Sequence, residues 1–525
     1  MIFLSQRIQP RTVQTITYQP ALRPALPCIY GPLEYREQRD LYERIDGILR
    51  TSGLEQEFIN LAVPDRKFDV VTAGAKRVDR FARMSVLALR SNIARRLMGL
   101  DHREFCTRLA DSALLQWFLS VGQVDAVKVF AKSSSDRFSR WVGEQAVRAI
   151  NEKFTALLTE SGDSAPSVPF GLTSPINGEE MFFDSTCLTA DIHFPIDWVL
   201  LRDAVRTLMK ATVLIRKAGL RNRMPMEPLA FLSEMNTLCM KMSAARRTAD
   251  SKRQRKKVLR EMKTLAKRIA DHAMAHKEAL VTRRNETDIT EGRALHIIGR
   301  IEGVLAQLPA AIKQAHERII GGRQVPNEGK ILSLYDDSVQ VLVRGKAGAE
   351  VEFGNKLWLG ESREGLVLDY KLYQDNPGDS TLVKPAIQRL VVEQNLALKN
   401  VWGDRGLWSK TNRKMLEEMN IGNGLCPRDV RELADRLAND AGFREGLKRR
   451  AGTEARIGIF KNVFMGRPAR EKGFEHRELA VGWAVLGHNL WVVARMARAA
   501  QQEQEARQKT VTRNKPRRDP EKRAA

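Results

Sequence analysis

Apolar residues recur every three or four positions through most of the N-terminal third, which is the spacing of one face of an α-helix. The pattern is clearest in RMSVLALRSNIARRLMGL at 83–100, and it resumes after a glycine in GLDHREFCTRLADSALLQWFL at 99–119. A serine run then precedes another periodic stretch, and serine is a favoured N-cap residue. We therefore predict an all-helical domain over 36–160. The proline-rich residues 1–35 lack periodicity and are expected to form a flexible arm.

A strand-like pattern begins after a Ser-, Pro- and Gly-rich stretch at 161–178, which we interpret as a linker. The stretch MFFDSTCLTADIHF combines apolar, β-branched and aromatic residues in a short run and predicts a strand. Residues 198–320 are almost all helix formers, and the strand-rich segment 330–374 follows them. Alternating short strands and helices continue from there, so the pattern predicts a mixed α/β domain over 179–465.

The C-terminal region, 466–525, is expected to contain one helix at 475–505 followed by a basic, disordered tail. Its apolar stretch VGWAVLGHNLWVVARM is short and is interrupted by His488 and Asn489. These features favour a buried helix over a membrane span. The apolar run at the N-terminus is too short for a signal peptide, so we expect a cytoplasmic protein with no membrane partner.

The balance of charges changes this picture from a generic protein to one with a polyanionic partner. The chain has 87 Lys and Arg against 63 Asp and Glu, a net charge of +24 and an isoelectric point of about 10.0. Nucleic acid is the commonest partner of so basic a chain, although a membrane surface would fit the same sum. The five cysteines are far apart and form no CxxC pair, which excludes a disulfide framework and a cysteine zinc site.

Two basic segments are candidates for contact with DNA. Lys132, Arg137 and Arg140 lie at the start of a helix that follows a helix and a short turn, which suits insertion into a DNA groove. The second segment could lie along a phosphate backbone, and its candidate residues are Lys252, Arg253, Arg255, Lys256 and Lys257. A helical bundle with a solvated basic surface would produce both patterns as well.

Three carboxylates stand out by their positions. Asp184 lies within a predicted strand and Asp404 ends another, where a carboxylate costs free energy unless it is paired or bound to a metal. Turn capping is the ordinary alternative. Glu454 lies among cations, and helical spacing puts it on one face with Arg450 and Lys461. This arrangement fits either an ion-pair ladder or a metal site that handles phosphate.

The remaining acids near these positions, and the motifs that the chain lacks, indicate no other kind of catalytic site. Asp191, Asp197 and Asp203 are interpreted as turn or surface acids, and Trp408 as a core residue. The chain has no GxSxG, HExxH, GxxxxGK[ST] or strand-linked GxGxxG motif, and its eight histidines do not cluster. Serine hydrolase, zinc protease, P-loop and dinucleotide-binding functions are therefore not indicated.

Four segments follow one another along the chain: FFDSTCLTADIHFPID, RGKAGAEVEFGNKLWL, NVWGDRGLWS and RRAGTEARIGIFK. In this order they resemble the DDE transposases of bacterial insertion sequences. The last segment matches that family's R-x3-E-x6-K signature at Arg450, Glu454 and Lys461. The family usually has a tyrosine where this chain has Leu447. The segment ALRSNIARRLMGLDHREFCTRLADS also resembles the family's helical N-terminal domain, so the resemblance spans 80–495.

The resemblance implies a catalytic trio of Asp184, Asp404 and Glu454 that binds two Mg²⁺ ions, with Mn²⁺ as an expected substitute. Arg450 and Lys461 would orient or bind phosphate. Two ions about 4 Å apart activate the attacking oxygen and neutralise the leaving one in phosphodiester chemistry. Asp404 lies 220 residues after Asp184, and Glu454 lies 50 residues after Asp404, so the fold must gather distant segments.

The family's α/β ribonuclease H-like fold would gather them, with the first acid on the first strand, the second at the end of the fourth and the third on a later helix. The helices of 198–320 would then be a large basic insertion in the catalytic domain, which the all-α N-terminal domain precedes. The implied partners are double-stranded DNA, as element ends and as target, and a second copy of the chain in a homodimer on paired ends. Two alternatives stay open: a DNA-binding protein or repressor without catalysis, and a ribonuclease H-like nuclease without strand transfer.

Overall fold

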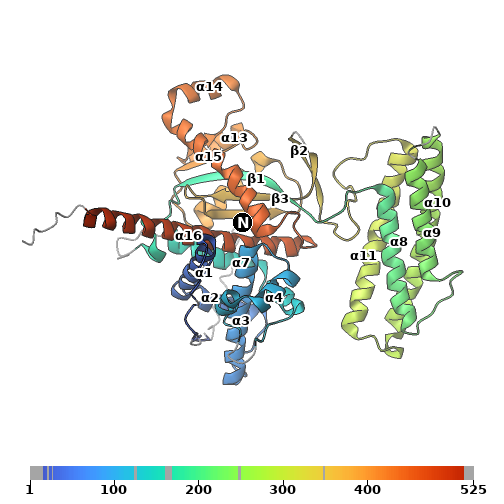
Figure 1. Cartoon of the computed structure of the whole chain (residues 1–525). Helices are drawn as coiled ribbons and strands as arrows, with labels where there is room; N and C mark the ends of the chain where they lie inside the picture. The colour runs from blue at the N-terminus through green and yellow to red at the C-terminus, as the bar shows by residue number, and fades with distance from the viewer. Residues whose placement is uncertain are drawn as a thin grey trace, which may run out of the picture.

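The protein divides into a helical N-terminal part, a central sheet and a separate helical bundle (Figure 1). The computed structural model describes residues 16–20, 23–26, 28–122, 127–159, 168–245, 247, 250–346 and 349–513. Its secondary structure is mixed α/β with many helices. The expected tail beyond residue 513 and the first part of the linker, 161–167, lie outside the described residues.

The N-terminal part is all-helical over the described residues and shares one core with the long C-terminal helix α16 (Phe474–Arg513). A capping box begins α4, in which Asp101 and Glu104 satisfy the first backbone N–H groups. Inside the core, the buried Arg90 donates hydrogen bonds to Asp46 and Glu55, both at 2.6 Å. The helices are α1 (Leu33–Thr51), α2 (Leu54–Asp65), α3 (Ala75–Met98), α4 (His102–Asp111), α5 (Ala113–Leu119), α6 (Lys132–Ser139) and α7 (Glu144–Thr159).

The flexible arm expected over residues 1–35 is not what its described residues form. Ile16 is 4% exposed and belongs to the core of the helical part. Arg23 forms an ion pair with Asp46 at 2.7 Å, and its guanidinium lies 4.6 Å from the ring centroid of Trp117. The described residues between 16 and 32 are not helical, and the side chains of Ile16 and Arg23 anchor them to the domain.

The central sheet is mixed, with the strand order β2-β3-β1-β5-β6 and with β4 also paired to β3. β1 lies between an antiparallel neighbour, β3, and a parallel neighbour, β5. The parallel edge is continued by β6. The strands are β1 (Glu180–Thr189), β2 (Gln340–Lys346), β3 (Ala349–Glu361), β4 (Val367–Tyr373), β5 (Asn400–Gly403) and β6 (Gly422–Leu425).

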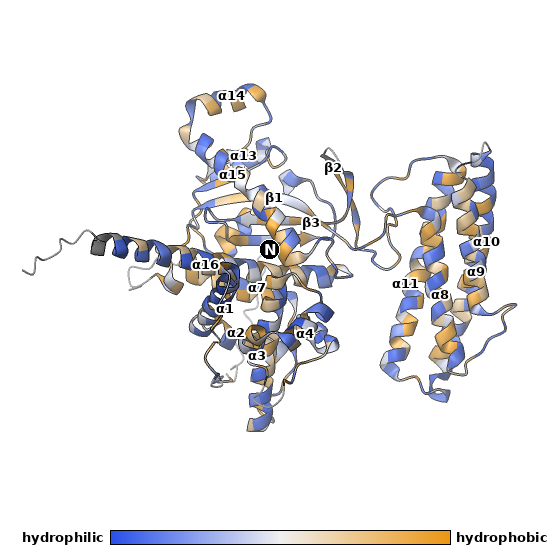
Figure 2. Cartoon of the chain, viewed as in Figure 1, coloured by the Kyte–Doolittle hydropathy of each residue, from blue (hydrophilic) through white to orange (hydrophobic). Residues whose placement is uncertain are grey.

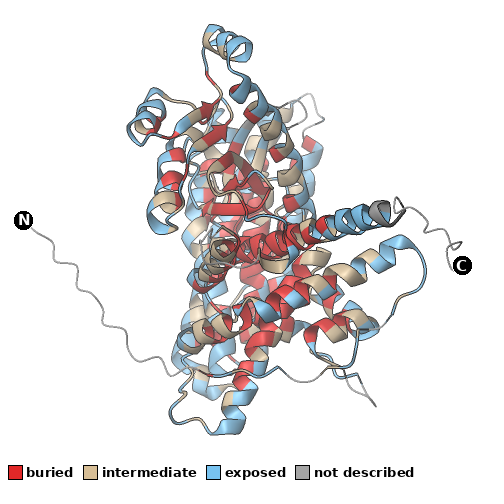
Figure 3. Ribbon diagram, turned by 90° about the vertical axis from the view of Figure 1, so that its left-hand side faces the viewer, coloured by how far each residue is buried: buried red, intermediate tan, exposed pale blue. Residues whose placement is uncertain are grey.

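Helices connect and cover these strands. α12 (Val383–Gln388) and α13 (Lys410–Glu418) flank β5, and α14 (Val430–Asn439) leads into α15 (Ala441–Ile459). A π-helical turn, Phe460–Met465, continues α15 without a break. The apolar stretch of α16 is mostly buried between α3, α7 and β4, as the red band along this helix shows (Figure 3). It is a core helix, as the sequence pattern predicted.

The bundle lies between β1 and β2 in chain order and stands apart from the rest of the molecule (Figure 1). Its helices bury their own apolar core, so the orange residues gather between helices while the outer faces are largely blue (Figure 2). Among the described residues, two helices are long and apolar enough to cross a membrane, α16 and α11. α11 contributes Ile297, Ile301 and Val304 to the core of the bundle. The helices are α8 (Asp197–Lys217), α9 (Pro228–Ala245), α10 (Ser251–Arg283) and α11 (Glu291–Ala315).

Two acids of the bundle correct an expectation from the sequence. Asp197 and Asp203 are buried, so their interpretation as turn or surface acids is wrong. Asp197 pairs with Arg318 at 3.0 Å, and Asp203 lies 2.6 Å from His193. Burial of these carboxylates is tolerated because each has a partner of potentially opposite charge. The first contact joins the start of α8 to the turn after α11, and the second joins α8 to the loop that precedes it.

Candidate active site

The register of the sheet brings Asp184 and Asp404 to neighbouring strands. β1 and β5 pair in parallel, with Phe182 opposite Trp402. Asp184 and Asp404 each lie two residues further along, so the two carboxylates follow the same register. Asp184 is in the middle of β1. Asp404 comes immediately after β5, the fifth strand of the chain and not the fourth as the resemblance implies, because β2, β3 and β4 all precede it. The pairing of β1 with β5 therefore brings together two residues that are far apart in the sequence.

A cleft of about 610 Å³ opens beside these two residues, and α15 forms one of its walls. Glu454, from α15, and Lys461, from the π-helical turn, line the same cleft as Asp184 and Asp404. The sequence analysis singled out five residues for the site, and four of them therefore line one cleft. Each comes from a different segment, so the convergence is a property of the fold.

The electrostatics of the cleft disfavour a charged Asp184. Burial, followed by the neighbouring carboxylate of Asp404, raises the pKa of Asp184 to about 6. Glu454 acts in the same direction, whereas Arg450 and the backbone N–H of Ser185, which donates to Asp184 Oδ1 at 2.7 Å, oppose the increase. A buried carboxyl that resists ionisation beside a second carboxylate is suited to binding a cation, which would relieve the repulsion between them.

The ion-pair ladder considered for Glu454 does not form. Arg449 and Arg456 instead reach Glu361, at the end of β3, at 3.2 and 3.1 Å. Thr453 Oγ1 also donates to Glu361, at 2.7 Å. Within the part of the chain that the structure describes, Glu454 has no ion pair within 4.0 Å, and its side chain is exposed to the cleft. The solvated-ladder interpretation is therefore wrong for this residue.

Two cations accompany the acids in different ways. Lys461 is buried, and its Nζ donates to Thr186 Oγ1 on β1 at 3.2 Å. Arg450 does not line the cleft, but its charge lowers the pKa of Asp184, and its buried Nε has no hydrogen-bond partner among the described residues. Leu447, where the resembled family has tyrosine, packs beside Phe182, Trp402 and Phe443. At this position the chain has an apolar contact in place of a hydroxyl group.

A fourth carboxylate at the cleft was missed by the sequence analysis. Asp379 Oδ1 accepts hydrogen bonds from Ser185 Oγ at 2.9 Å and from Lys356 Nζ at 2.8 Å. Its other oxygen and Asp404 Oδ1 both lie within 3.4 Å of the position that a Cβ on Gly406 would occupy. Asp379 begins a single 3₁₀ turn after a proline- and glycine-containing loop, so no periodicity marks it. Its proximity to Asp404 appears only in the folded chain.

The oxygen-rich lining suits Mg²⁺, which prefers carboxylate ligands and keeps several waters. Among the described residues, no three His, Cys, Asp or Glu side chains are close enough together to hold one ion. A pair of ions has a smaller requirement, because each needs only one or two carboxylates besides water and phosphate. Asp184, Asp404 and Glu454 fit that requirement by donor type and by their shared cleft.

The candidate DNA-contacting residues lie away from this cleft, on two other parts of the molecule. Lys132 and Arg137 are exposed on α6, and Arg140 follows that helix and pairs with Asp136. In the bundle, Arg255 stacks over Trp198 at 5.6 Å from its ring centroid. The exposed cations near the start of α10 are Lys252, Arg253 and Lys257, and Lys256 is half-buried.

Comparison with protein-family models, with curated proteins and with solved structures gave no match to this chain.

Proposed function

We propose that the protein is a DNA transposase of the DDE class, which cleaves DNA at the ends of its own element and joins the freed ends to target DNA. The observation that carries this proposal is the cleft in which Asp184, Asp404 and Glu454 converge with Lys461. The order of strands supports a ribonuclease H-like fold for this domain, with β1 between antiparallel β3 and parallel β5. The acids stand on β1, after β5 and on α15.

The residues singled out from the sequence each have a role in this chemistry. Asp184, Asp404 and Glu454 would hold two Mg²⁺ ions, which when bound stabilise charge on the attacking and leaving oxygens of a phosphodiester. The raised pKa of Asp184 supports this assignment, because a cation relieves the same repulsion as a proton does. Lys461, held by Thr186, would add positive charge where a phosphate would lie and would orient it, and Arg450 would act through its charge from outside the cleft lining.

The distribution of charge supports DNA as the partner. The bundle, 197–321, has 26 Lys and Arg against 13 Asp and Glu, so it carries about half of the chain's net charge of +24. An excess of cations on exposed helical faces binds phosphate backbones and releases counterions. We propose that the bundle grips double-stranded DNA while the cleft acts on it, that two copies act on paired ends, and that the protein works in the cytoplasm on the nucleoid.

The test is a cleavage assay with purified protein and a DNA fragment that carries the ends flanking the gene, with and without Mg²⁺ or Mn²⁺. We expect metal-dependent cuts at the ends, followed by joining to a target plasmid. A Glu454→Gln variant should lose cleavage by about 100-fold or more, because losing an outer-shell partner of a metal ligand already costs about 10- to 100-fold. Glu445→Gln is the matched control, because Glu445 lies on the same helix, is exposed and pairs with Arg363.

The outcomes distinguish the alternatives. Cuts without joining would identify a nuclease of this fold. DNA binding without any cuts in either metal would identify a DNA-binding protein or repressor. Equal cleavage by wild-type protein and by Glu454→Gln would overturn the assignment of Glu454.

A further inference from the structure

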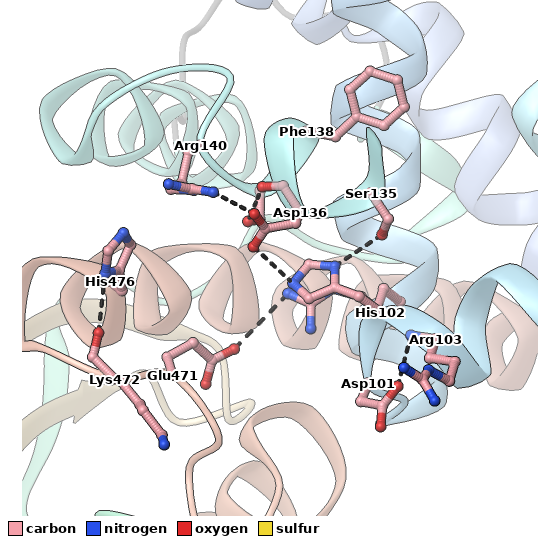
Figure 4. Close-up of polar contacts among 12 residues, drawn as sticks. Asp101, His102, Arg103, Ser135, Asp136, Phe138, Arg140, Glu471, Lys472 and His476 are labelled. Atoms are coloured by element: carbon pink, nitrogen blue, oxygen red, sulfur yellow. Dashed lines mark hydrogen bonds and ion pairs between the residues drawn. The ribbon is translucent and has the colours of Figure 1, made fainter. Parts of the chain in front are cut away.

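A second cavity lies where the N-terminal helices meet the start of α16. It measures about 320 Å³ and is separate from the cleft of Asp184. Its walls come from the end of α3, the start of α4, the end of α6 and the segment 464–483 (Figure 4). Gly99 lets the end of α3 approach the turn Phe460–Met465 closely, because a Cβ there would lie 2.6 Å from the carbonyl oxygen of Val463.

The lining of this cavity is rich in cations and poor in acids to balance them. Five Lys and Arg residues face three acids, together with His102 and His476. Two of the acids pair with two of the lining cations. Asp136 pairs with Arg140, and Asp101 caps α4 and lies 3.5 Å from Arg470. The five cations are Arg95, Arg96, Arg140, Arg470 and Lys472.

The third acid, Glu471, is engaged by Arg96. Arg96 Nη2 donates to Glu471 Oε1 at 2.6 Å, and its Nη1 donates to the carbonyl of Phe464 at 3.3 Å. The Nε of Arg96 and the Oε2 of Glu471 are both buried without a hydrogen-bond partner in the described part of the chain. This pair therefore fastens α3 to the segment before α16.

Arg95 is the cation that the cavity leaves without an adequate partner. It is 5% exposed, and its polar contacts with described residues are both long: 3.5 Å to the carbonyl of Leu100 and 3.9 Å to Glu471 Oε1. Burial, followed by the charge of Arg96, lowers its pKa to about 9, so it remains protonated at neutral pH. A buried charge with such weak compensation is unfavourable, and a bound anion would compensate it.

The neighbouring histidine does not add to the charge. Burial, then the positive charge of Arg95, lowers the pKa of His102 to about 4, so its ring is neutral. Its Nδ1 lies 2.9 Å from Ser135 Oγ. A neutral imidazole, a guanidinium with free donor capacity and the rim cations Arg470 and Lys472 are together suited to an oxyanion.

We infer that this cavity is a phosphate-binding site, with Arg95 as its buried anchor and Arg470 at its rim. The volume admits a phosphate group with its attached sugar, and it excludes a base pair. Arg95 would supply charge-assisted hydrogen bonds, which guanidinium groups form with phosphate oxygens in a forked geometry. This inference does not rest on the proposed function of the cleft. The phosphate could be free in solution or part of a DNA backbone.

The experiment measures binding of inorganic phosphate to the full chain by isothermal titration calorimetry at constant ionic strength. We expect saturable binding that is weakened about tenfold or more in Arg95→Gln, the factor expected from losing a charge-assisted hydrogen bond. Because Arg95 is buried, Arg470→Gln at the rim provides a second variant that leaves the packing intact, and it should also weaken binding. Arg108→Gln is the control, because Arg108 is exposed on α4 outside the cavity and pairs with Asp111.

A second measurement distinguishes the two sources of phosphate, using the fluorescence anisotropy of a short labelled duplex. If inorganic phosphate displaces the duplex at constant ionic strength from wild-type protein but not from Arg470→Gln, the site holds a backbone phosphate. If phosphate binds without displacing DNA, the site holds a free phosphate group. The inference is overturned if wild-type protein shows no saturable phosphate binding, or if Arg470→Gln binds phosphate as the Arg108→Gln control does.

Discussion

Replacing Asp184 by asparagine should stabilise the metal-free protein at neutral pH while it abolishes cleavage. Burial and the neighbouring Asp404 raise the pKa of this carboxyl from 3.8 to about 6. In the folded protein the carboxylate form is therefore disfavoured relative to the unfolded chain. Asparagine keeps the shape and can still accept the hydrogen bond from the backbone N–H of Ser185. It removes the charge that the site holds at a cost.

The sign and the size of the change in unfolding free energy follow from the linkage between proton binding and folding. An acid with a raised pKa in the folded state binds more protons when folded, so the stability of the wild-type protein falls as the pH rises between about 4 and 6. A shift of about two pKa units corresponds to about 3 kcal/mol above that window. Asp184→Asn should therefore be more stable than wild type by up to about 3 kcal/mol at pH 7, with little difference near pH 4.

The assay is urea unfolding followed by circular dichroism at both pH values, in the presence of a chelator. Asp336→Asn is a control of opposite sign, since hydrogen bonds from Arg477 and Ser338 outweigh burial and lower the pKa of Asp336. That variant should lose stability at pH 7. Adding Mg²⁺ should stabilise wild type more than Asp184→Asn, because binding to the folded state adds to stability. An Asp184→Asn protein that is less stable than wild type at pH 7, or equally shifted at both pH values, would refute the reasoning.

Two further predictions concern the surroundings of the cleft and the bundle. Lys356→Met removes the cation that holds Asp379 beside Asp404, and it should raise the Mg²⁺ concentration for half-maximal cleavage by about 10- to 100-fold. A metal titration that matches wild type would contradict this role. Replacing Lys252, Arg253 and Lys257 by glutamine should weaken duplex binding and reduce the slope of log affinity against log salt by about 0.9 for each phosphate that the variant no longer neutralises. An unchanged slope would remove the start of α10 from the DNA interface.

Asp184 and Asp404 could be found from sequence because the local pattern defines the strands to which they belong. An apolar, β-branched run predicts the strand that contains Asp184, and a short strand predicts the end at which Asp404 lies. The all-helical N-terminal part and the buried C-terminal helix follow in the same way from helical periodicity. Their relative placement does not, because it depends on the parallel register of β1 and β5, whose residues are more than 200 positions apart.

Partners of charged residues could not be predicted, because each lies on a distant element. The sequence suggests a turn or surface acid at Asp197, but this residue is buried against Arg318, which lies 121 positions later in the turn after α11. Asp379 was overlooked because it is joined to the cleft by Lys356 of β3 and Ser185 of β1. A carboxylate in a loop has the same sequence pattern whether it faces solvent or a cluster of other acids.

The cations around Glu454 have their explanation in how α15 docks on the sheet. Arg449, Thr453 and Arg456 are spaced to share one face of the helix, and all three reach the buried Glu361 at the end of β3. Gly446 lets the same helix approach β5, because a Cβ there would lie 2.1 Å from the Trp402 ring. These contacts fix the rotation of α15.

Glu454 follows Thr453 by one residue, so it lies about 100° around the helix from the docking face. The docking contacts thus satisfy the neighbouring arginines and aim Glu454 at the cleft with no ion pair of its own among the described residues. In the sequence, a lone acid among bases suggests an ion-pair ladder along one helix. Helical spacing cannot reveal that the bases have their partner on a strand. Here the bases hold the helix through Glu361, and the acid is left available for the chemistry of the cleft.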